Sequence, residues 1–350
     1  MDVCRVAFSV TELRTNQYIS LLCSALQQEG VTVSKINWKD VLQKRVQAIH
    51  VHWPEHFLRP LTKLSHIKLL SGFLCKLVVA RIIGIPVIWT VHNTWPHDSK
   101  VNKRILKWYL ALWVRMVNAC IYMSPSTRFE NEQVHPAIKG KPYAIIPHGH
   151  YKDIISSSIT KGSARRELGL DDGATVLSHC GIIRSYKNTR KLVDFFSAIP
   201  GDDLCLVIAG KCSDKKLLKE LQQSAAKDSR IKFMNRLLPE AEITAITAAS
   251  DMVVLPYTKV ANSGVAFYAL SVGRPVLGPR LGAFRDLHDQ FGDWIRLYDG
   301  DFKSADLKDA INWVRSRPEL PVLDLSDSDW QSIAKRTKQF YEAEAMRVAG

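Results

Sequence analysis

Short apolar runs alternate with amphipathic stretches along the chain, and this alternation constrains the fold more than any other feature. In the first half, strand-like runs occur at 3–10, 31–36, 48–52, 86–91, 119–123 and 143–146. Helix-like stretches lie between them at 16–28, 61–83 and 101–117. Such alternation is typical of a parallel sheet covered by helices on both faces.

The alternation restarts after 152–170, a polar and serine-rich stretch that we interpret as a crossing between domains. Strand-like runs follow at 175–179, 204–209, 231–234, 252–255 and 275–277, and helix-like stretches at 189–198, 214–227, 240–249, 264–272 and 329–346. We therefore predict an α/β fold with two tandem Rossmann-like domains, at 1–152 and 153–328, and a closing helix at 329–350. Ligands of open parallel sheets bind beyond the carboxyl ends of the strands, so the expected site is a cleft between the domains.

Charge and cysteine content narrow the possible partners and the compartment. The 350-residue chain carries a net charge of +14, which favours an acidic partner: nucleic acid, an anionic membrane or a phosphorylated ligand. Its seven cysteines are scattered without a C-x-x-C pair, so neither a disulfide framework nor a zinc site is expected. The amino-terminal residues do not resemble a signal peptide, and the apolar run at 77–89 is too short to span a bilayer. We therefore expect a reduced, cytoplasmic setting.

The stretch GIIRSYKN, at 181–188, follows one strand-like run and combines a glycine with two cations. Gly181 leaves space at the strand end, and Arg184 and Lys187 supply positive charge that can neutralise phosphates. The chain contains neither G-x-x-x-x-G-K-[ST] nor G-x-G-x-x-G, which argues against an ATPase and against a dinucleotide-binding protein.

A second strand end in the same half carries Asn262, Ser263 and Gly264 directly before the helix-like stretch at 264–272. The amino end of a helix offers backbone N–H groups and the positive end of its dipole, and serine is a common cap. Glycine lets an anion approach the backbone closely. Together with the two cations, this helix end predicts a diphosphate site that needs no metal ion.

Imidazole and carboxylate groups follow two strand-like runs of the first half. His52 lies near Glu55, and His92 lies near His97 and Asp98. Groups of this kind at one cleft are candidates for a general base. Their spacing does not support a metal site.

Several stretches together resemble those of a known enzyme family. They are HVHWPEHFLR, VHNTWPHD, PHGHYKD, IIRSYKN, LPYTKVANSGVAFYALSVGRPVL and DLSDSDWQSI, in this order. The chain resembles GT-B glycosyltransferases, and more closely the bacterial mannosyltransferases of xanthan assembly, from about residue 50 to about residue 335. The resemblance implies transfer of a β-1,4-linked mannose from GDP-mannose to a polyprenyl-diphosphate-linked oligosaccharide during exopolysaccharide assembly.

One departure from the wider superfamily bears on the stereochemistry of transfer. Many retaining GT-B enzymes carry two glutamates eight positions apart, and Val260 and Tyr268 occupy the corresponding places here. The resemblance therefore implies an inverting enzyme, in which a base takes the proton of the acceptor hydroxyl. We expect this base among His92, Asp98 and Glu55, with no order among them.

The remaining site predictions follow from the strand ends and the resemblance together. Residues expected to bind the donor are Gly181, Arg184, Lys187, Tyr257, Asn262, Ser263 and Gly264. Residues expected at the acceptor or in the cleft are His52, Asn93, His97, His148 and His150. No cofactor or metal is expected beyond the GDP-mannose donor.

A lipid-linked acceptor requires contact with a membrane. The helix-like stretches at 61–83 and 101–117 carry basic and apolar residues, and the second also carries aromatic ones, which suits an anionic bilayer surface. We therefore expect a peripheral protein on the cytoplasmic face of the inner membrane.

Three alternatives remain open. The first is a GT-B glycosyltransferase with another nucleotide sugar or a soluble acceptor. The second is a sensor of nucleotide sugars that does not catalyse transfer. The third is a nucleic-acid-binding protein, but no known reader motif is present, and nucleic acid is not an expected partner.

Overall fold

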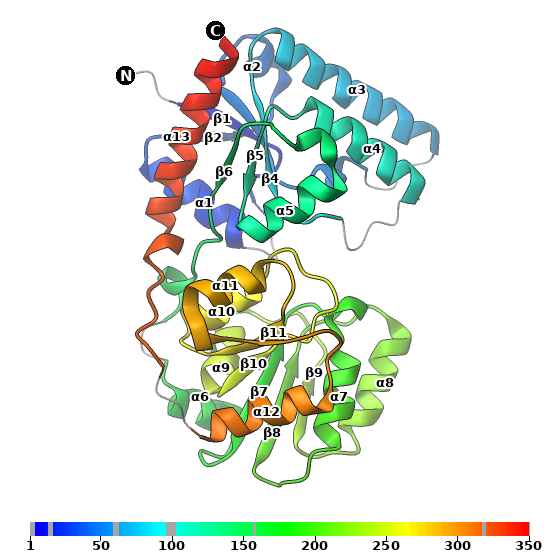
Figure 1. The fold of residues 1–350 in the computed structure, drawn as a ribbon, viewed down its shortest axis with the longest axis vertical. Coiled ribbons are helices and arrows are strands. Elements are labelled where there is room, and N and C mark those ends of the chain that lie inside the picture. The colour runs from blue at the N-terminus through cyan, green and yellow to red at the C-terminus, as the bar shows by residue number, and fades with distance from the viewer. Residues whose placement is uncertain are drawn as a thin grey trace. The chain divides into compact units, whose positions relative to one another are not determined.

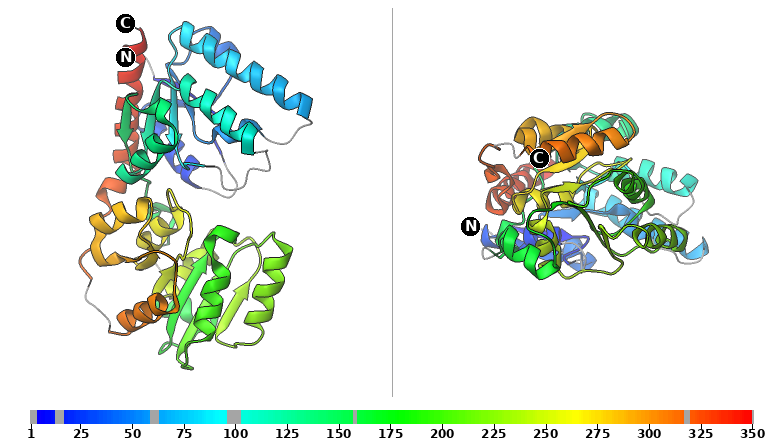
Figure 2. Two further views of the ribbon diagram at one scale, coloured as in Figure 1. Left: turned by 45° about the vertical axis from the view of Figure 1, so that its right-hand side comes forward. Right: turned by 90° about the horizontal axis from the view of Figure 1, so that it is seen from below.

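The computed structural model describes residues 4–12, 17–58, 63–95, 103–156, 159–316 and 320–349. The chain divides into two compact units, one formed by Met1–Gly149 with Ser326–Gly350 and one formed by His150–Leu325. Among the described residues, each unit contains one six-stranded sheet in which all neighbouring strands are parallel (Figures 1 and 2). The predicted α/β fold with two Rossmann-like domains is confirmed.

The sheet of the first unit has the strand order β2-β1-β3-β4-β5-β6. Its strands are β1 (Arg5–Phe8), β2 (Thr32–Lys35), β3 (Ala48–Val51), β4 (Val87–Val91), β5 (Ala119–Tyr122) and β6 (Tyr143–Ile145). The helices of this unit are α1 (Gln17–Gln28), α2 (Trp38–Leu42), α3 (Lys63–Ile82), α4 (Lys103–Met116), α5 (Pro125–Val134) and α13 (Trp330–Ala349). All six strand-like runs predicted for the first half are therefore present, each shortened by one or two residues at one or both ends.

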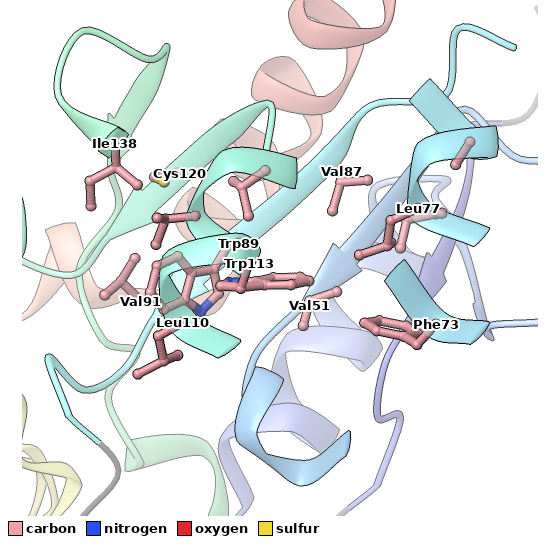
Figure 3. Packing of buried hydrophobic residues seen from close by; sticks show 14 of the residues in the cluster. Val51, Phe73, Leu77, Val87, Trp89, Val91, Leu110, Trp113, Cys120 and Ile138 are labelled. Atoms are coloured by element: carbon pink, nitrogen blue, oxygen red, sulfur yellow. The ribbon is translucent and has the colours of Figure 1, made fainter. Parts of the chain in front are cut away.

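β1, β3, β4 and β5 are buried except at Arg5, as is typical of parallel strands that helices cover on both faces. On one face, Phe73 and Leu77 of α3 and Trp113 of α4 pack against the strands (Figure 3). On the other face, α1 and α13 pack against the strands. The final helix, set apart in the sequence prediction, thus shares the core of the first unit.

The sheet of the second unit has the strand order β12-β11-β10-β7-β8-β9. Its strands are β7 (Thr175–Cys180), β8 (Leu204–Ala209), β9 (Ile231–Met234), β10 (Met252–Val254), β11 (Val276–Pro279) and β12 (Ile295–Tyr298). The helices are α6 (Lys161–Leu168), α7 (Thr189–Ser197), α8 (Lys215–Ala225), α9 (Glu240–Ala249), α10 (Gly264–Ser271), α11 (Ala283–Phe291) and α12 (Ser304–Arg315). α7, α8 and α12 pack on one face, and α6 and α9 on the other.

The stretch 152–170, interpreted from its serines as a crossing, contains the helix α6. Its start has a capping box, in which Thr160 and Ser163 exchange side-chain and backbone hydrogen bonds. Its end is set by Gly169, which adopts the left-handed conformation that favours glycine. The capping box and the terminal glycine are both local sequence signals for a helix, but the polar composition of the stretch favoured its interpretation as a loop.

None of the described helices is both long enough and apolar enough to cross a bilayer.

Candidate active site

The carboxyl end of β7 comes very close to that of its neighbour β8. Gly181, the residue after β7, has a φ of +100° and donates a hydrogen bond to the Ala209 carbonyl at 2.9 Å. A Cβ atom on Gly210 would lie only 2.0 Å from the Gly181 carbonyl oxygen. Both positions therefore require glycine: Gly181 for its backbone angle and Gly210 for the close approach.

Lys187 is a buried cation beside this strand end. Its side chain is only 7% exposed, and its Nζ lies 5.3 Å from the centre of the Tyr257 ring. In the part of the chain that the structure describes, no carboxylate lies within ion-pair distance of Lys187. Burial lowers the pKa of Lys187 to about 8; the Cys180 thiol opposes this shift and the nearby Arg184 charge adds to it. Burial disfavours the charged form of Lys187, and an anion bound beside its ammonium group would favour that form again.

The start of α10 faces the same strand end. A Cβ atom on Gly181 would lie 3.1 Å from Lys187 Nζ and 3.6 Å from Cγ2 of Val265, in the first turn of α10. Ser263 caps the helix, because its side-chain oxygen accepts a hydrogen bond from the Ala266 N–H at 3.2 Å. The amino end of α10 and the buried ammonium group are therefore neighbours.

Backbone contacts hold the two predicted donor loops together. The Thr258 N–H donates to the Tyr186 carbonyl at 2.8 Å, and the Tyr186 and Tyr257 rings lie 5.9 Å apart. Burial raises the pKa of Tyr257, and the Ser263 side chain beside it acts in the opposite direction. Tyr257 and Ser263 are thus part of one buried cluster.

The other predicted donor residues lie in these same loops. Arg184 directly precedes the short 3-10 turn Ser185–Lys187 and is close enough to affect the pKa of Lys187. Asn262 is half-buried beside Ser263, and Gly264 is the first residue of α10. The structure therefore brings all seven predicted donor residues to two adjoining loops of the second unit.

The positions where many retaining relatives carry glutamates have no acidic group here. Tyr268 is directed toward α9, where its hydroxyl forms a hydrogen bond with Thr244 Oγ1. Its ring also packs against Tyr151, with ring centres 5.2 Å apart. Val260 is half-buried, and its carbonyl lies against Gly282, where a Cβ atom would come within 2.2 Å of the oxygen. Both residues have local packing roles.

In the first unit, two of the predicted histidines form a pair. His52 follows β3 and is 1% exposed, and His92 follows β4 and is half-buried. Nδ1 of His52 lies 3.0 Å from Nε2 of His92. The Trp53 ring stacks on His92 with centres 4.2 Å apart, and Tyr18 of α1 meets His92 edge-on at 5.2 Å.

His50 lies below this pair and was not among the predicted site residues. Its Nε2 lies 2.7 Å from Thr90 Oγ1, and its Nδ1 lies 2.6 Å from the hydroxyl of Tyr341 on α13. Burial lowers the pKa of His50 to about 3, so it is neutral. Its ring centre is 4.2 Å from that of His52, so His50 packs directly against the pair. The alternating pattern His50-Val51-His52 is the sequence signal for two imidazoles on one face of a strand.

Glu55 lies in the 3-10 turn Pro54–Leu58, just after Trp53. The Tyr109 hydroxyl of α4 anchors this turn by donating a hydrogen bond to the Pro54 carbonyl at 2.8 Å. Burial raises the pKa of Glu55 to about 7, and its hydrogen bond with its own backbone acts in the opposite direction. A carboxyl group with this pKa exchanges protons readily near neutral pH, as a general base must.

The remaining predicted acceptor and cleft residues lie in different places. His148 is buried beside Tyr18, with ring centres 4.9 Å apart, and burial lowers its pKa to about 4. His150 is buried at the start of the second unit, where its Nδ1 accepts a hydrogen bond from the Lys152 N–H. Asn93 is half-buried directly after His92. His97 and Asp98 lie outside the described residues.

Within the described ranges, no cluster of three or more histidine, cysteine, aspartate or glutamate residues is arranged to hold a metal ion.

The chain is similar to known proteins in both sequence and fold. Residues 174–315 match the family described as "Glycosyl transferases group 1". The chain is 29% identical over 331 residues to the GDP-mannose:glycolipid 4-beta-D-mannosyltransferase of Xanthomonas campestris pv. campestris, which covers 92% of this chain and 86% of that protein.

Solved structures share the fold of the whole chain. The sucrose-phosphate synthase of Thermosynechococcus elongatus matches with a TM-score of 0.71 at 14% identity, covering 99% of this chain and 100% of the other. HepE of Anabaena, solved in complex with UDP, matches with a TM-score of 0.64 at 16% identity, covering 99% and 98%. The chain is therefore a glycosyltransferase of the GT-B fold, similar over most of its length to a bacterial GDP-mannose:glycolipid mannosyltransferase.

Proposed function

We propose that this enzyme transfers mannose from GDP-mannose to a polyprenyl-diphosphate-linked oligosaccharide during exopolysaccharide assembly. The observation that carries the proposal is the extent of the similarity to the Xanthomonas enzyme. It covers 92% of this chain, and thus both the unit that contains the donor loops and the unit that contains the histidine pair. A shared donor domain alone would match only part of the chain, as the group 1 family does.

The second unit binds the donor through its diphosphate. Lys187 supplies a buried charge that no described carboxylate neutralises, and the amino end of α10 supplies backbone N–H groups and the positive end of its dipole. Gly181 keeps the space beside Lys187 open, since a Cβ atom there would approach Nζ to 3.1 Å. Arg184 is close enough to lower the pKa of Lys187, Asn262 directly precedes Ser263, and the centre of the buried Tyr257 ring lies 5.3 Å from Lys187 Nζ.

The first unit supplies the base for an inverting displacement. The base takes the proton of the acceptor hydroxyl while that oxygen attacks the anomeric carbon, and the bond to the GDP oxygen breaks on the opposite side. Lys187 and α10 neutralise the charge that develops on the departing diphosphate, so no metal ion is needed for this step. The candidate bases are Glu55, His92 and Asp98, and the raised pKa of Glu55, about 7, suits this role.

The first unit also provides a surface for a lipid-linked acceptor. Trp108 of α4 is 58% exposed beside the exposed cations Arg104 and Lys107, and Ile82 at the end of α3 is 77% exposed. An indole ring with neighbouring cations suits the headgroup region of an anionic bilayer. The protein would then act as a peripheral enzyme on the cytoplasmic face of the inner membrane.

A transfer assay tests the proposal. The purified chain is incubated in separate reactions with GDP-mannose, GDP-fucose, UDP-glucose or ADP-glucose and a polyprenyl-diphosphate oligosaccharide, and the glycolipid product is measured. We expect transfer from GDP-mannose alone, unchanged by EDTA, and a β-anomeric proton signal in the product. Transfer only from a uridine or adenosine donor, or only to an oligosaccharide that lacks the lipid, would favour another glycosyltransferase activity and overturn the proposal.

A further inference from the structure

The buried histidine pair of the first unit constrains what His92 can do. His52 and His92 share a single hydrogen bond, between Nδ1 of His52 and Nε2 of His92, over 3.0 Å. Only one of these two nitrogens can carry the shared hydrogen when both rings are neutral. The position of that hydrogen therefore fixes the tautomer of both rings.

His52 is neutral in the folded protein. It lies against the rings of Phe8, His50 and Trp53, with centres 5.3, 4.2 and 5.7 Å away. Burial in this apolar setting lowers its pKa well below the ordinary value, and the neighbouring histidines lower it further. Its ring therefore carries one hydrogen, on either Nδ1 or Nε2.

The second nitrogen of His52 decides between the two tautomers. Nε2 is buried and has no hydrogen-bond partner among the described residues. A buried N–H group without an acceptor is rarer in folded proteins than an acceptor without a donor. The hydrogen of His52 therefore belongs on Nδ1, where His92 accepts it, and the unpartnered Nε2 is left without a hydrogen.

We propose that His52 is a positioning residue that donates its Nδ1–H to Nε2 of His92, so that neutral His92 carries its own hydrogen on Nδ1. With Nε2 engaged as an acceptor and Nδ1 protonated, His92 has no lone pair to receive a proton from the acceptor hydroxyl. Nδ1 of His92 then presents a hydrogen-bond donor and not a proton acceptor. The role of base falls to Glu55 or Asp98. This consequence for catalysis rests on the proposed function, whereas the tautomer does not.

Nitrogen NMR of the whole protein tests the tautomer without any substrate. Uniform ¹⁵N labelling of histidine gives two ring signals for each of the 11 histidines, and the spectra of His52→Asn and His92→Asn identify the pair. We expect the shift of a hydrogen-bearing nitrogen for Nδ1 of both residues and that of a bare nitrogen for both Nε2 atoms. A hydrogen on Nε2 of His52 would overturn the proposal, whether or not the protein transfers mannose.

A pair of substitutions tests the donor role of His92. The amide nitrogen of asparagine lies near the place of a histidine Nδ1, so His92→Asn keeps a donor and cannot act as a base. We expect kcat/KM of His92→Asn to be about tenfold higher than that of His92→Ala, because a tenfold difference corresponds to the contribution of about one hydrogen bond. The acid limb of its pH profile should stay where it is in the unmodified enzyme. Equal losses in both variants, with disappearance of that limb, would show that His92 is the base.

The role of His52 is tested by rescue. His52→Asn keeps an amide donor near the position of Nδ1, and His52→Leu removes it. We expect the leucine variant to lose the His92 tautomer in the NMR spectrum and part of kcat, and the asparagine variant to recover both. His288→Asn, at a histidine bonded to the Ile295 carbonyl in the second unit, is the matched control. An unchanged His92 tautomer in a folded His52→Leu variant would contradict the positioning role.

Discussion

At the scale of single residues, the buried Lys187 makes donor binding depend on pH. Its pKa is about 8 in the unliganded protein, and only the charged form attracts a diphosphate. Raising the pH through this value removes the charge, so the affinity for GDP should fall about tenfold between about pH 7 and about pH 9. Isothermal titration calorimetry across this range measures the change.

Lys187→Arg is the control, because a guanidinium group stays charged throughout this range. The arginine variant should bind GDP with an affinity that changes little with pH, and Lys187→Ala should bind weakly at every pH. A pH dependence that persists in both variants would place the titrating group elsewhere.

Glu55 gives a second prediction, for both stability and rate. Its folded-state pKa of about 7 lies above the ordinary 4.5, so the folded protein favours the protonated form. Ionising Glu55 destabilises the folded protein; this destabilisation is absent at low pH and reaches its full size above pH 7. Glu55→Gln should therefore raise the free energy of unfolding by about 2–3 kcal/mol at about pH 8 and change it little at about pH 4.

Transfer should respond to the same substitution in the opposite direction. If Glu55 is the base, Glu55→Gln lowers kcat by about 10²–10⁴-fold and leaves the affinity for GDP unchanged. Chemical denaturation at the two pH values and single-turnover transfer provide the readouts. A stabilised variant with normal kcat would remove Glu55 from the candidate bases.

The sequence indicates single site residues where a strand end and a chemical type coincide. It indicates Gly181, Lys187 and Ser263 in this way, and the structure places them near one another at two strand ends, while their role in donor binding stays a prediction. Gly210 has no such signal, because its requirement for glycine comes from the close approach of a neighbouring strand end. The contact of His50 with Tyr341 joins residues 291 positions apart and has no local signal.

At the scale of elements, the amino end of α10 should contribute to GDP binding beyond its stability. Ser263→Ala removes the cap and should cost about 1 kcal/mol in the free energy of unfolding. It should also weaken GDP binding, because the first turn of the helix loses its fixed geometry beside Lys187.

Thr160→Ala is the matched variant, since Thr160 caps α6 by the same side-chain contact. It should cost a similar amount of stability and leave GDP affinity unchanged, as measured by denaturation and calorimetry. Equal GDP affinity in the two variants would show that α10 contributes only to the fold.

Elements were predictable where apolar periodicity is strong and missed where polar residues interrupt it. The buried strands β1, β3, β4 and β5 of the first sheet were predictable because they are mostly apolar. In the second sheet β12 was missed, since its four residues include Arg296, whose guanidinium stacks on Trp313. α6 was missed because serines surround its cap.

At the scale of the whole molecule, the exposed face of α3 and α4 should bind anionic membranes. Trp108→Ser and Ile82→Ser should each reduce sedimentation with vesicles of phosphatidylglycerol and phosphatidylcholine, without changing GDP affinity. Val322→Ser, at a 96% exposed residue of the second unit, is the control. Two results would contradict a membrane-binding role for this face. One is undiminished sedimentation of a variant that combines Trp108→Ser and Ile82→Ser, and the other is equal sedimentation of the unmodified protein with vesicles of phosphatidylcholine alone.

The central claim is that the second unit binds the donor diphosphate between Lys187 and the amino end of α10. A crystal structure of the protein with GDP tests this most directly. We expect the β-phosphate within hydrogen-bond distance of Lys187 Nζ and of backbone N–H groups in the first turn of α10, with Gly181 beside it. A diphosphate bound away from Lys187 and Ser263 would contradict the claim.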